Sequence, residues 1–243
     1  MGNAILFFLI AILYASVGFG GGSGYIAILS FTDLPPSQLR FIALCCNVVV
    51  VSGGTAVFIR HKLLNVKKAL PLVISSVPLA FLGGSIELPH ESFFILLASC
   101  LLVSGLLMIK QPHNTSNPKS SSVALNLVIG GIIGFVSGLV GIGGGIFLAP
   151  LLYLIKWDSA RVIAATSSFF ILVNSLAGLA GQSYAGSIMI EWSVLVPPLL
   201  AVGVGGLIGS RVNINILTQI RVKRLTAVLV IFASLRIFYR LLI

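Results

Sequence analysis

The organisation of this chain follows from one stretch, Leu139-Val140-Gly141-Ile142-Gly143-Gly144-Gly145-Ile146-Phe147-Leu148-Ala149-Pro150, in which glycines interrupt an apolar segment. An earlier stretch, Val17-Gly18-Phe19-Gly20-Gly21-Gly22-Ser23-Gly24-Tyr25, has the same character. Glycine weakens a helix interior, so both stretches are predicted to be breaks between helices. Lipid cannot hydrogen-bond a broken backbone, so each break must be enclosed by protein or by a water-filled cavity. Two such breaks, one in each half, point to the site of a secondary carrier.

The composition places the chain in a membrane. Of its 243 residues, 58% are hydrophobic and 8% are charged, which is far more apolar than a soluble domain of this size. The formal net charge is +10, but the basic residues lie between the apolar runs rather than on one face. Such charges set membrane topology, so we expect a lipid bilayer and no nucleic acid as a partner.

The sequence offers little to enzyme chemistry. No Asp or Glu lies within an apolar span, and the three His residues all lie in loops. Cys45, Cys46 and Cys100 lie inside apolar runs and show no metal-binding spacing. We therefore predict that the chain is not an enzyme and has no catalytic residue, metal site, disulfide framework or cofactor. No nucleotide-binding domain is present in the sequence, so a passive or ion-coupled carrier, or a channel, is expected.

The second half of the chain repeats the first. Residues 17–22 match residues 140–145, and residues 40–43 match residues 161–164. Between the halves lies a linker with two prolines and three consecutive serines. We predict an all-α integral membrane protein with two homologous halves. The first membrane repeat, the cytoplasmic linker and the second membrane repeat are predicted to be residues 1–109, 110–122 and 123–243.

The glycine-broken segments decide the topology. Residues 3–17 form an arm of about 22 Å as a helix, which is too short for a bilayer core of about 30 Å. We expect each broken segment to re-enter the membrane, which leaves three transmembrane helices in each half and an inverted repeat. The positive-inside rule favours this arrangement, because it places 12 of the 15 Lys and Arg residues inside, against eight for a parallel repeat with eight crossings. Residues 123–140 are almost long enough to span alone, so eight crossings stay open as the alternative.

The broken backbone is suited to an anion. It offers N–H groups, and a half-helix that begins after each break adds the positive end of its dipole. Neither break is a phosphate loop or a dinucleotide fingerprint, because the Lys and the third glycine of those motifs are absent. The alternative is that the glycines only allow close packing, as Gly130, Gly134 and Gly138 are expected to do. The predicted substrate-binding glycines are Gly18, Gly20, Gly21, Gly22, Gly141, Gly143, Gly144 and Gly145.

Polar side chains follow both breaks. Asn47 in the first half and Thr166, Ser167 and Ser168 in the second are donors within apolar helices. Such donors suit an oxyanion that must be held without being trapped, so we predict that they bind the substrate. The alternative is that the hydroxyls bond to carbonyls of their own helix. Further polar residues along these helices are Ser52, Thr55, Asn174 and Ser175.

Arg40 and Arg161 open these helices at equivalent positions of the two halves. We predict that they attract anions at the two entrances of the pathway. The alternative is that they anchor their helices at the membrane interface.

The paired Gly-x-Gly-Gly-Gly motifs carry a family resemblance. Together with residues 146–150, 161–168 and 206–210, they resemble the TauE/SafE family of sulfite exporters over nearly the whole chain. The resemblance implies a carrier in the bacterial inner membrane for sulfite, thiosulfate, organosulfonates or related small anions. The first copy departs from the family pattern at Ser23-Gly24-Tyr25 and Cys45-Cys46-Asn47, so the substrate within the family stays open.

We therefore expect a secondary transporter that exports small sulfur-containing anions. A monovalent anion leaving a cell at about −100 mV gains roughly 2.3 kcal/mol, so export needs no coupling ion, whereas uptake does. No carboxylate lies in an apolar span to bind a proton or a sodium ion. The alternatives are an anion channel, an uptake carrier for a related small organic anion, and a scaffold subunit that transports nothing.

Overall fold

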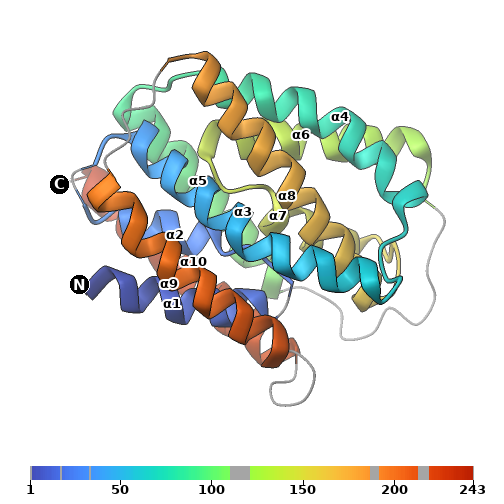
Figure 1. The fold of residues 1–243 in the computed structure, drawn as a ribbon. Coiled ribbons are helices and arrows are strands. Elements are labelled where there is room, and N and C mark those ends of the chain that lie inside the picture. Colours follow the sequence, from blue (N-terminus) through green and yellow to red (C-terminus); the bar gives the residue numbers. More distant parts are fainter. Residues whose placement is uncertain are drawn as a thin grey trace.

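Helices make up most of the structure, a computed structural model that describes residues 2–16, 18–32, 34–109, 121–186, 192–212 and 219–242 (Figure 1). Over these residues the chain contains ten α-helices and no strand. The helices are α1 Gly2–Ala15, α2 Gly22–Leu29, α3 Pro36–Arg60, α4 Val66–Ser85, α5 His90–Ile109, α6 Val123–Val140, α7 Gly145–Leu154, α8 Ala160–Tyr184, α9 Trp192–Val212 and α10 Gln219–Leu242. The predicted all-α class is confirmed.

Local sequence signals set the ends of α6. Ser122 caps its N-terminus, where the side-chain oxygen accepts a hydrogen bond from the Leu125 N–H at 3.1 Å. Gly141 ends the helix in the left-handed conformation, with φ at +78°. As a result α6 covers residues 123–140, the same run that the hydropathy pattern predicts.

Glycines bring α4 and α6 into close contact. Gly130, Gly134 and Gly138 share one face of α6, and a Cβ atom on any of them would overlap the backbone of α4. α9 and α1 meet in the same way, since a Cβ on Gly205 or Gly209 would lie 2.6 or 2.5 Å from a backbone oxygen of α1. The predicted packing role of the three α6 glycines is confirmed.

The helices of the two halves have matching neighbours. α4 packs on α6 as α9 packs on α1, and α4 contacts α8 as α9 contacts α3. α3 and α8 run antiparallel (Figure 1). Leu44 in the first half of α3 lies against Gly178 in the second half of α8, whereas Thr55 and Ser168 pair the opposite halves. Helices from the two halves of the chain are therefore interleaved, and α3 and α8 point in opposite directions.

Six of the described helices are long and apolar enough to cross a membrane. They are α3, α4, α5, α6, α8 and the Trp192–Ser210 part of α9. α1 and α7 are apolar but shorter, so α6 is one of the six whereas the matching helix α1 is not. α10, which contains the predicted span 225–242, is also not among the six and carries Arg236 and Arg240 near its end.

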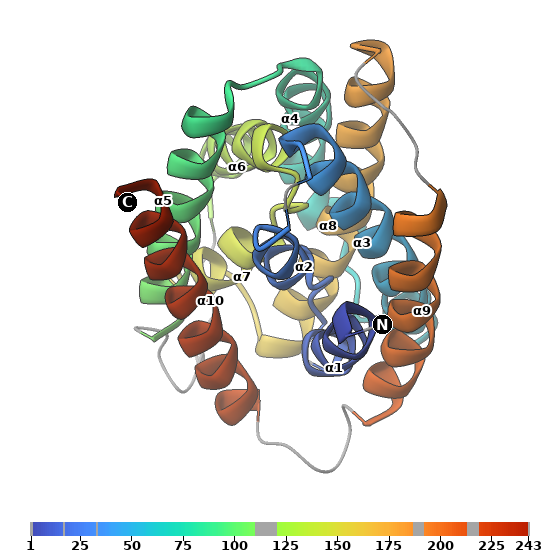
Figure 2. The ribbon, with the colours of Figure 1, turned by 90° about the vertical axis from the view of Figure 1, so that its left-hand side faces the viewer.

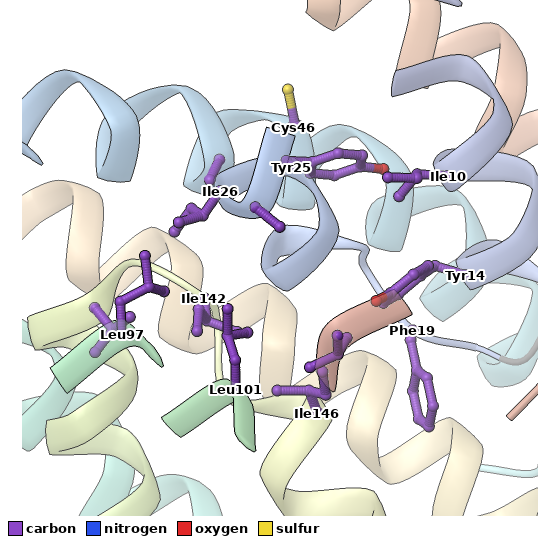
Figure 3. Packing of buried hydrophobic residues seen from close by; sticks show 14 of the residues in the cluster. Ile10, Tyr14, Phe19, Tyr25, Ile26, Cys46, Leu97, Leu101, Ile142 and Ile146 are labelled. Carbon is purple, nitrogen blue, oxygen red and sulfur yellow. The ribbon is translucent and has the colours of Figure 1, made fainter. Parts of the chain in front are cut away.

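The two short helices α2 and α7 lie in the middle, with the longer helices around them (Figure 2). All eight residues of α2 are buried, and the Tyr25 ring stacks on Phe7 with the ring centres 5.0 Å apart. Ile142 of the second break belongs to the same buried hydrophobic cluster as Leu97 and Leu101 of α5 (Figure 3). Every described residue of both breaks is buried. The breaks are thus enclosed by protein, as broken backbone at membrane depth requires.

Candidate functional site

Both predicted breaks are present in the structure. α1 ends at Ala15 and α2 begins at Gly22, while α6 ends at Val140 and α7 begins at Gly145. Left-handed backbone, with φ between +78° and +94°, occurs at Gly18, Gly21, Gly141, Gly143 and Gly144. Side chains with a Cβ atom rarely adopt this conformation. The breaks therefore require glycine for the backbone itself as well as for packing.

Each break ends at the N-terminus of a short helix. Helix geometry leaves the first N–H groups of α2 and α7 without partners in their own helix. The N-cap residues, Gly21 and Gly144, provide no side-chain acceptor for these groups. None of the described Asp and Glu residues is buried, so no carboxylate of the described chain occupies these positions. The starts of α2 and α7 thus have no carboxylate partner among the described residues, and a helix N-terminus of this kind favours negative charge.

Asn47 joins the two breaks. Its side chain is fully buried, and Nδ2 donates a hydrogen bond to the Ile142 carbonyl oxygen at 2.9 Å. A Cβ on Gly20 would lie 2.5 Å from Asn47 Oδ1, and a Cβ on Gly22 would overlap the same amide. On the other side, a Cβ on Gly143 would lie 2.7 Å from Asn47 Nδ2. One side chain of α3 therefore touches the start of α2 and the break before α7.

α8 closes the opposite side of this meeting point with Ile171 and Ser175. A Cβ on Gly143 would lie 2.8 Å from Ser175 Oγ and 3.0 Å from Ile171 Cγ2, and Ile171 is also the nearest neighbour of Gly145. Both side chains are buried. We define the central site as Gly20, Gly22, Asn47, Gly143, Gly145, Ile171 and Ser175. The sequence prediction did not include Ile171 or Ser175 as binding residues, although Ser175 follows Ser168 by two helical turns and so shares its face.

Several buried polar atoms on the helices around the central site have no hydrogen-bond partner among the described residues. They are Asn47 Oδ1, Ser137 Oγ, Thr166 Oγ1, Ser167 Oγ, Asn174 Oδ1 and Ser175 Oγ. A buried polar atom without a partner destabilises a fold by about 1 to 3 kcal/mol. Native proteins retain few such atoms, and each one needs an explanation. A ligand that exchanges hydrogen bonds with these atoms provides one.

The three predicted hydroxyl residues of α8 have different surroundings. Ser168 Oγ lies 3.0 Å from Thr55 Oγ1, so this pair links α8 to α3. The hydroxyls of Thr166 and Ser167 bond to no described atom, the carbonyls of their own helix included. The alternative interpretation, in which these two hydroxyls satisfy their own helix, is therefore wrong.

The remaining predicted glycines support the breaks from outside the central site. Gly18 packs on Ala164 of α8, with 3.3 Å between the Cβ positions. Gly141 packs on Arg40 of α3, whose Cβ would lie 2.7 Å from an added Cβ. The nearest side chains to Gly21 and Gly144 are those of Tyr25 and Phe170.

The two matched arginines are in different environments. Arg40 is only 3% exposed, and its guanidinium donates hydrogen bonds to four backbone carbonyls. The accepting residues are Gly83, Gly84 and Ile86 at the end of α4, at 3.2, 2.8 and 2.9 Å, and Gly138 near the end of α6, at 2.9 Å. Arg161 is exposed and forms no hydrogen bond or ion pair with any described residue. Arg40 thus binds the C-terminal ends of two helices, where a positive charge complements the helix dipoles.

Cations also lie at the outer ends of both short helices. Beyond α7, Lys68 Nζ lies 2.6 Å from the Trp157 carbonyl oxygen, 2.6 Å from Asp158 Oδ2 and 4.3 Å from the centre of the Trp157 ring. Beyond α2, Arg240 donates to the Ser30 carbonyl oxygen at 2.9 Å. The sequence patterns gave no signal for either contact, since each joins residues far apart in the chain.

The central site offers neutral hydrogen-bonding groups and helix dipoles. None of its residues carries a charge. Across the described ranges, no three His, Cys, Asp or Glu residues lie together as candidate metal ligands. The central site therefore offers N–H and O–H groups for hydrogen bonding and no charged side chain.

Proteins named as probable membrane transporters are similar to this chain over most of its length. The sequence model of the family described as Sulfite exporter TauE/SafE matches residues 3–237, a range that contains the whole central site. The probable membrane transporter protein y4hK of Sinorhizobium fredii is 33% identical, over 98% of this chain and 98% of that protein. YunE of Bacillus subtilis is 24% identical over 88% of this chain and 89% of that protein. MJ0441 of Methanocaldococcus jannaschii is 26% identical over 93% and 89%, respectively. Both are named probable membrane transporter proteins.

Proposed function

Because this chain belongs to the sulfite exporter TauE/SafE family of multi-pass membrane transporters, we propose that it is a secondary transporter of small sulfur-containing anions. The proposed substrates are sulfite, thiosulfate or an organosulfonate. The proposed location is the inner membrane of a bacterium, and the bilayer and the anion are its proposed partners.

One observation carries this proposal, namely that Asn47 contacts both the first residue of α2 and the break that leads into α7. The side chain of Asn47 contacts the start of α2 and the break before α7. We propose that both positive helix ends act on this buried place, where a negative charge would be favoured by both dipoles. Anions bind at such N-termini because the N–H groups already point outward from the helix.

The donors of the central site suit the oxygens of a sulfur oxyanion. Ser175 Oγ and the free N–H groups at the start of α2 and α7 can donate to these oxygens. No Lys or Arg is part of the central site, so the bound anion has no ion pair to break when it leaves. A carrier needs such moderate binding, because its substrate must be released on the other side of the membrane.

We further propose the inverted arrangement for the two repeats, residues 1–109 and 123–243, joined by the linker 110–122. The antiparallel packing of α3 and α8 supports it, because equivalent helices in a parallel repeat would run in the same direction. In this arrangement the α1–α2 and α6–α7 hairpins enter the membrane from opposite sides. Their tips meet near the midplane at the central site.

The proposed direction is export. An anion that leaves a cell at about −100 mV gains roughly 2.3 kcal/mol, so no coupling ion is required. The central site contains no carboxylate that could bind a coupling proton or sodium ion. The positive helix ends also disfavour a cation at this place.

Counterflow in liposomes tests this proposal. Liposomes that contain the reconstituted protein are preloaded with unlabelled sulfite. Uptake of labelled sulfite into them is then followed under an imposed membrane potential. Unlabelled thiosulfate, taurine, sulfoacetate, sulfate and lactate are added as competitors. We expect saturable counterflow that follows the potential without sodium or a pH gradient, and inhibition by the true substrates.

Three results would contradict the proposal in different ways. Single-channel current steps without saturable counterflow would indicate an anion channel. Strict dependence on sodium or a pH gradient would indicate an uptake carrier. Folded protein that moves none of these anions would leave a different substrate or a scaffold role. Gly20→Leu and Gly143→Leu should both abolish flux without preventing insertion, and normal flux in both would reject the central site.

A further inference from the structure

The two repeats match in sequence but differ in arrangement at Arg40 and Arg161. Both arginines lie in the first turns of the long helix that follows a break. Arg40 is buried and bonded to four carbonyls, whereas Arg161 is exposed and bonded to no described residue. Two matching residues of the same protein thus differ: one is docked, and the other is exposed and without a bond to the described residues.

The two breaks also contact their long helices at different positions. Gly141 lies against Arg40 itself, because the three atoms nearest to a Cβ added at Gly141 all belong to Arg40. Its match, Gly18, lies against Ala164, three residues further along its helix than Arg161. The difference is about one helical turn. The break beside the docked arginine therefore sits at the start of α3, and the other break sits one turn deeper along α8.

The docked and free arginines lie at opposite ends of one helix pair. α3 and α8 are antiparallel, so the start of each lies beside the end of the other. Asn47 and Ser175 of the central site lie between the two arginines on this pair. Each arginine can therefore control one of the two routes between the central site and the surfaces.

We propose that Arg40 and Arg161 are the two alternating locks of the transport cycle, an inference that rests on the proposed function. In the state described here Arg40 ties α3 to the ends of α4 and α6, and the route at its end is shut. In the opposite state Arg161 docks on the matching ends of α9 and α1, and Arg40 is released into water. α9 and α1 already pack closely there, through Gly209 and Ile12.

Arginine suits this role because it stays charged and presents five donors in a rigid planar group. A single side chain can then bind several C-terminal carbonyls at once, as Arg40 does. Each state contains one docked and one hydrated arginine, so the two states can be close in free energy. A carrier requires this balance, because both states must be populated in each cycle.

Sided labelling tests the locks. A reporter, Ser175→Cys, is placed in a chain whose three native cysteines are replaced by alanine. A thiol reagent that does not cross membranes is added to one or the other side of oriented vesicles. The ratio of the two labelling rates reports which route to the central site is open. It is measured with both arginines present and in Arg40→Gln, Arg161→Gln and the two matching lysine variants.

Replacing one of the two arginines should open the route between the central site and the surface at that arginine's end of the helix pair. Arg40→Gln should shift the labelling ratio at least about tenfold toward the Arg40 end, and Arg161→Gln should shift it toward the Arg161 end, given the strength of hydrogen bonds from a charged donor. The lysine variants should give smaller shifts in the same directions. Shifts of both glutamine variants in one direction, or unchanged ratios in inserted protein, would overturn the proposal. If Arg40→Gln fails to insert, Arg161→Gln alone decides, because it alters an exposed residue.

Counterflow of sulfite is measured in parallel on chains that retain Ser175. Opposite labelling shifts without counterflow of any anion would support the locks and reject the proposed function. Saturable counterflow with unchanged labelling would support the proposed function and reject the locks.

Discussion

Replacing Gly143 by alanine separates backbone strain from disturbance of the central site. Gly143 has φ at +82°, where alanine is destabilised by about 1 to 2 kcal/mol. The new Cβ would also lie 2.7 Å from Asn47 Nδ2 and 2.8 Å from Ser175 Oγ, so both groups must move. Such overpacking costs a further 1 to 3 kcal/mol, roughly. Gly143→Ala should therefore lower the free energy of unfolding by about 2 to 5 kcal/mol.

Gly186→Ala is the matched control. Gly186 has a similar φ, +71°, but no atom of the described residues lies within 4 Å of its added Cβ. The free energy of unfolding of Gly186→Ala should therefore fall only by the backbone contribution of about 1 to 2 kcal/mol. Thermal unfolding in detergent measures both variants, and sulfite counterflow measures their function. We expect Gly143→Ala to lose at least about tenfold in flux, on the scale of a kilocalorie or more of lost binding, and Gly186→Ala to retain it. Equal losses of stability and flux in the two variants would refute the packing argument.

Two further predictions concern packing and ion pairs outside the site. Gly134→Ala should destabilise the protein by more than about 2 kcal/mol because its Cβ would overlap the backbone of α4. Gly53→Ala, whose Cβ would meet no atom of the described residues within 4 Å, should stabilise α3 by about 0.5 to 1 kcal/mol. Thermal unfolding of the two variants checks this, and equal melting temperatures would be inconsistent with it. Lys68→Ala should destabilise by about 1 kcal/mol more than Asp158→Ala, because it also removes the contacts with the Trp157 carbonyl and ring. A larger loss for Asp158→Ala in the same unfolding assay would count against this interpretation.

Most helix positions could be predicted because their signals are local. The run 123–140 became α6 without change, since Ser122 and Gly141 mark its two ends. The two breaks were predicted from glycine, and the structure confirms them. α10 begins at Gln219 rather than at residue 225, because its first turn is polar and hydropathy does not detect it. The family resemblance drawn from the glycine motifs is confirmed by the match over residues 3–237.

The candidate site was predicted only in part because its contacts are long-range. Asn47 was predicted as a binding residue from its place in an apolar helix, but the sequence could not reveal that Nδ2 bonds to Ile142, 95 residues away. Ser175 joins the site only because α3 and α8 are antiparallel. Nor could the sequence reveal that Arg40 is docked while Arg161 is free, since a repeat predicts equal environments for matched residues.

Binding of labelled sulfite to purified Ser175→Ala most directly tests the central claim that the anion lies at the meeting point of the two breaks. Ser175 Oγ has no partner among the described residues, so its removal should leave the melting temperature unchanged or raise it. The loss of one donor should nevertheless weaken sulfite binding at least about fivefold. Ser183→Ala, which alters an exposed serine of the same helix, should bind as the parent does. Equal sulfite affinity in Ser175→Ala and the parent would contradict the account.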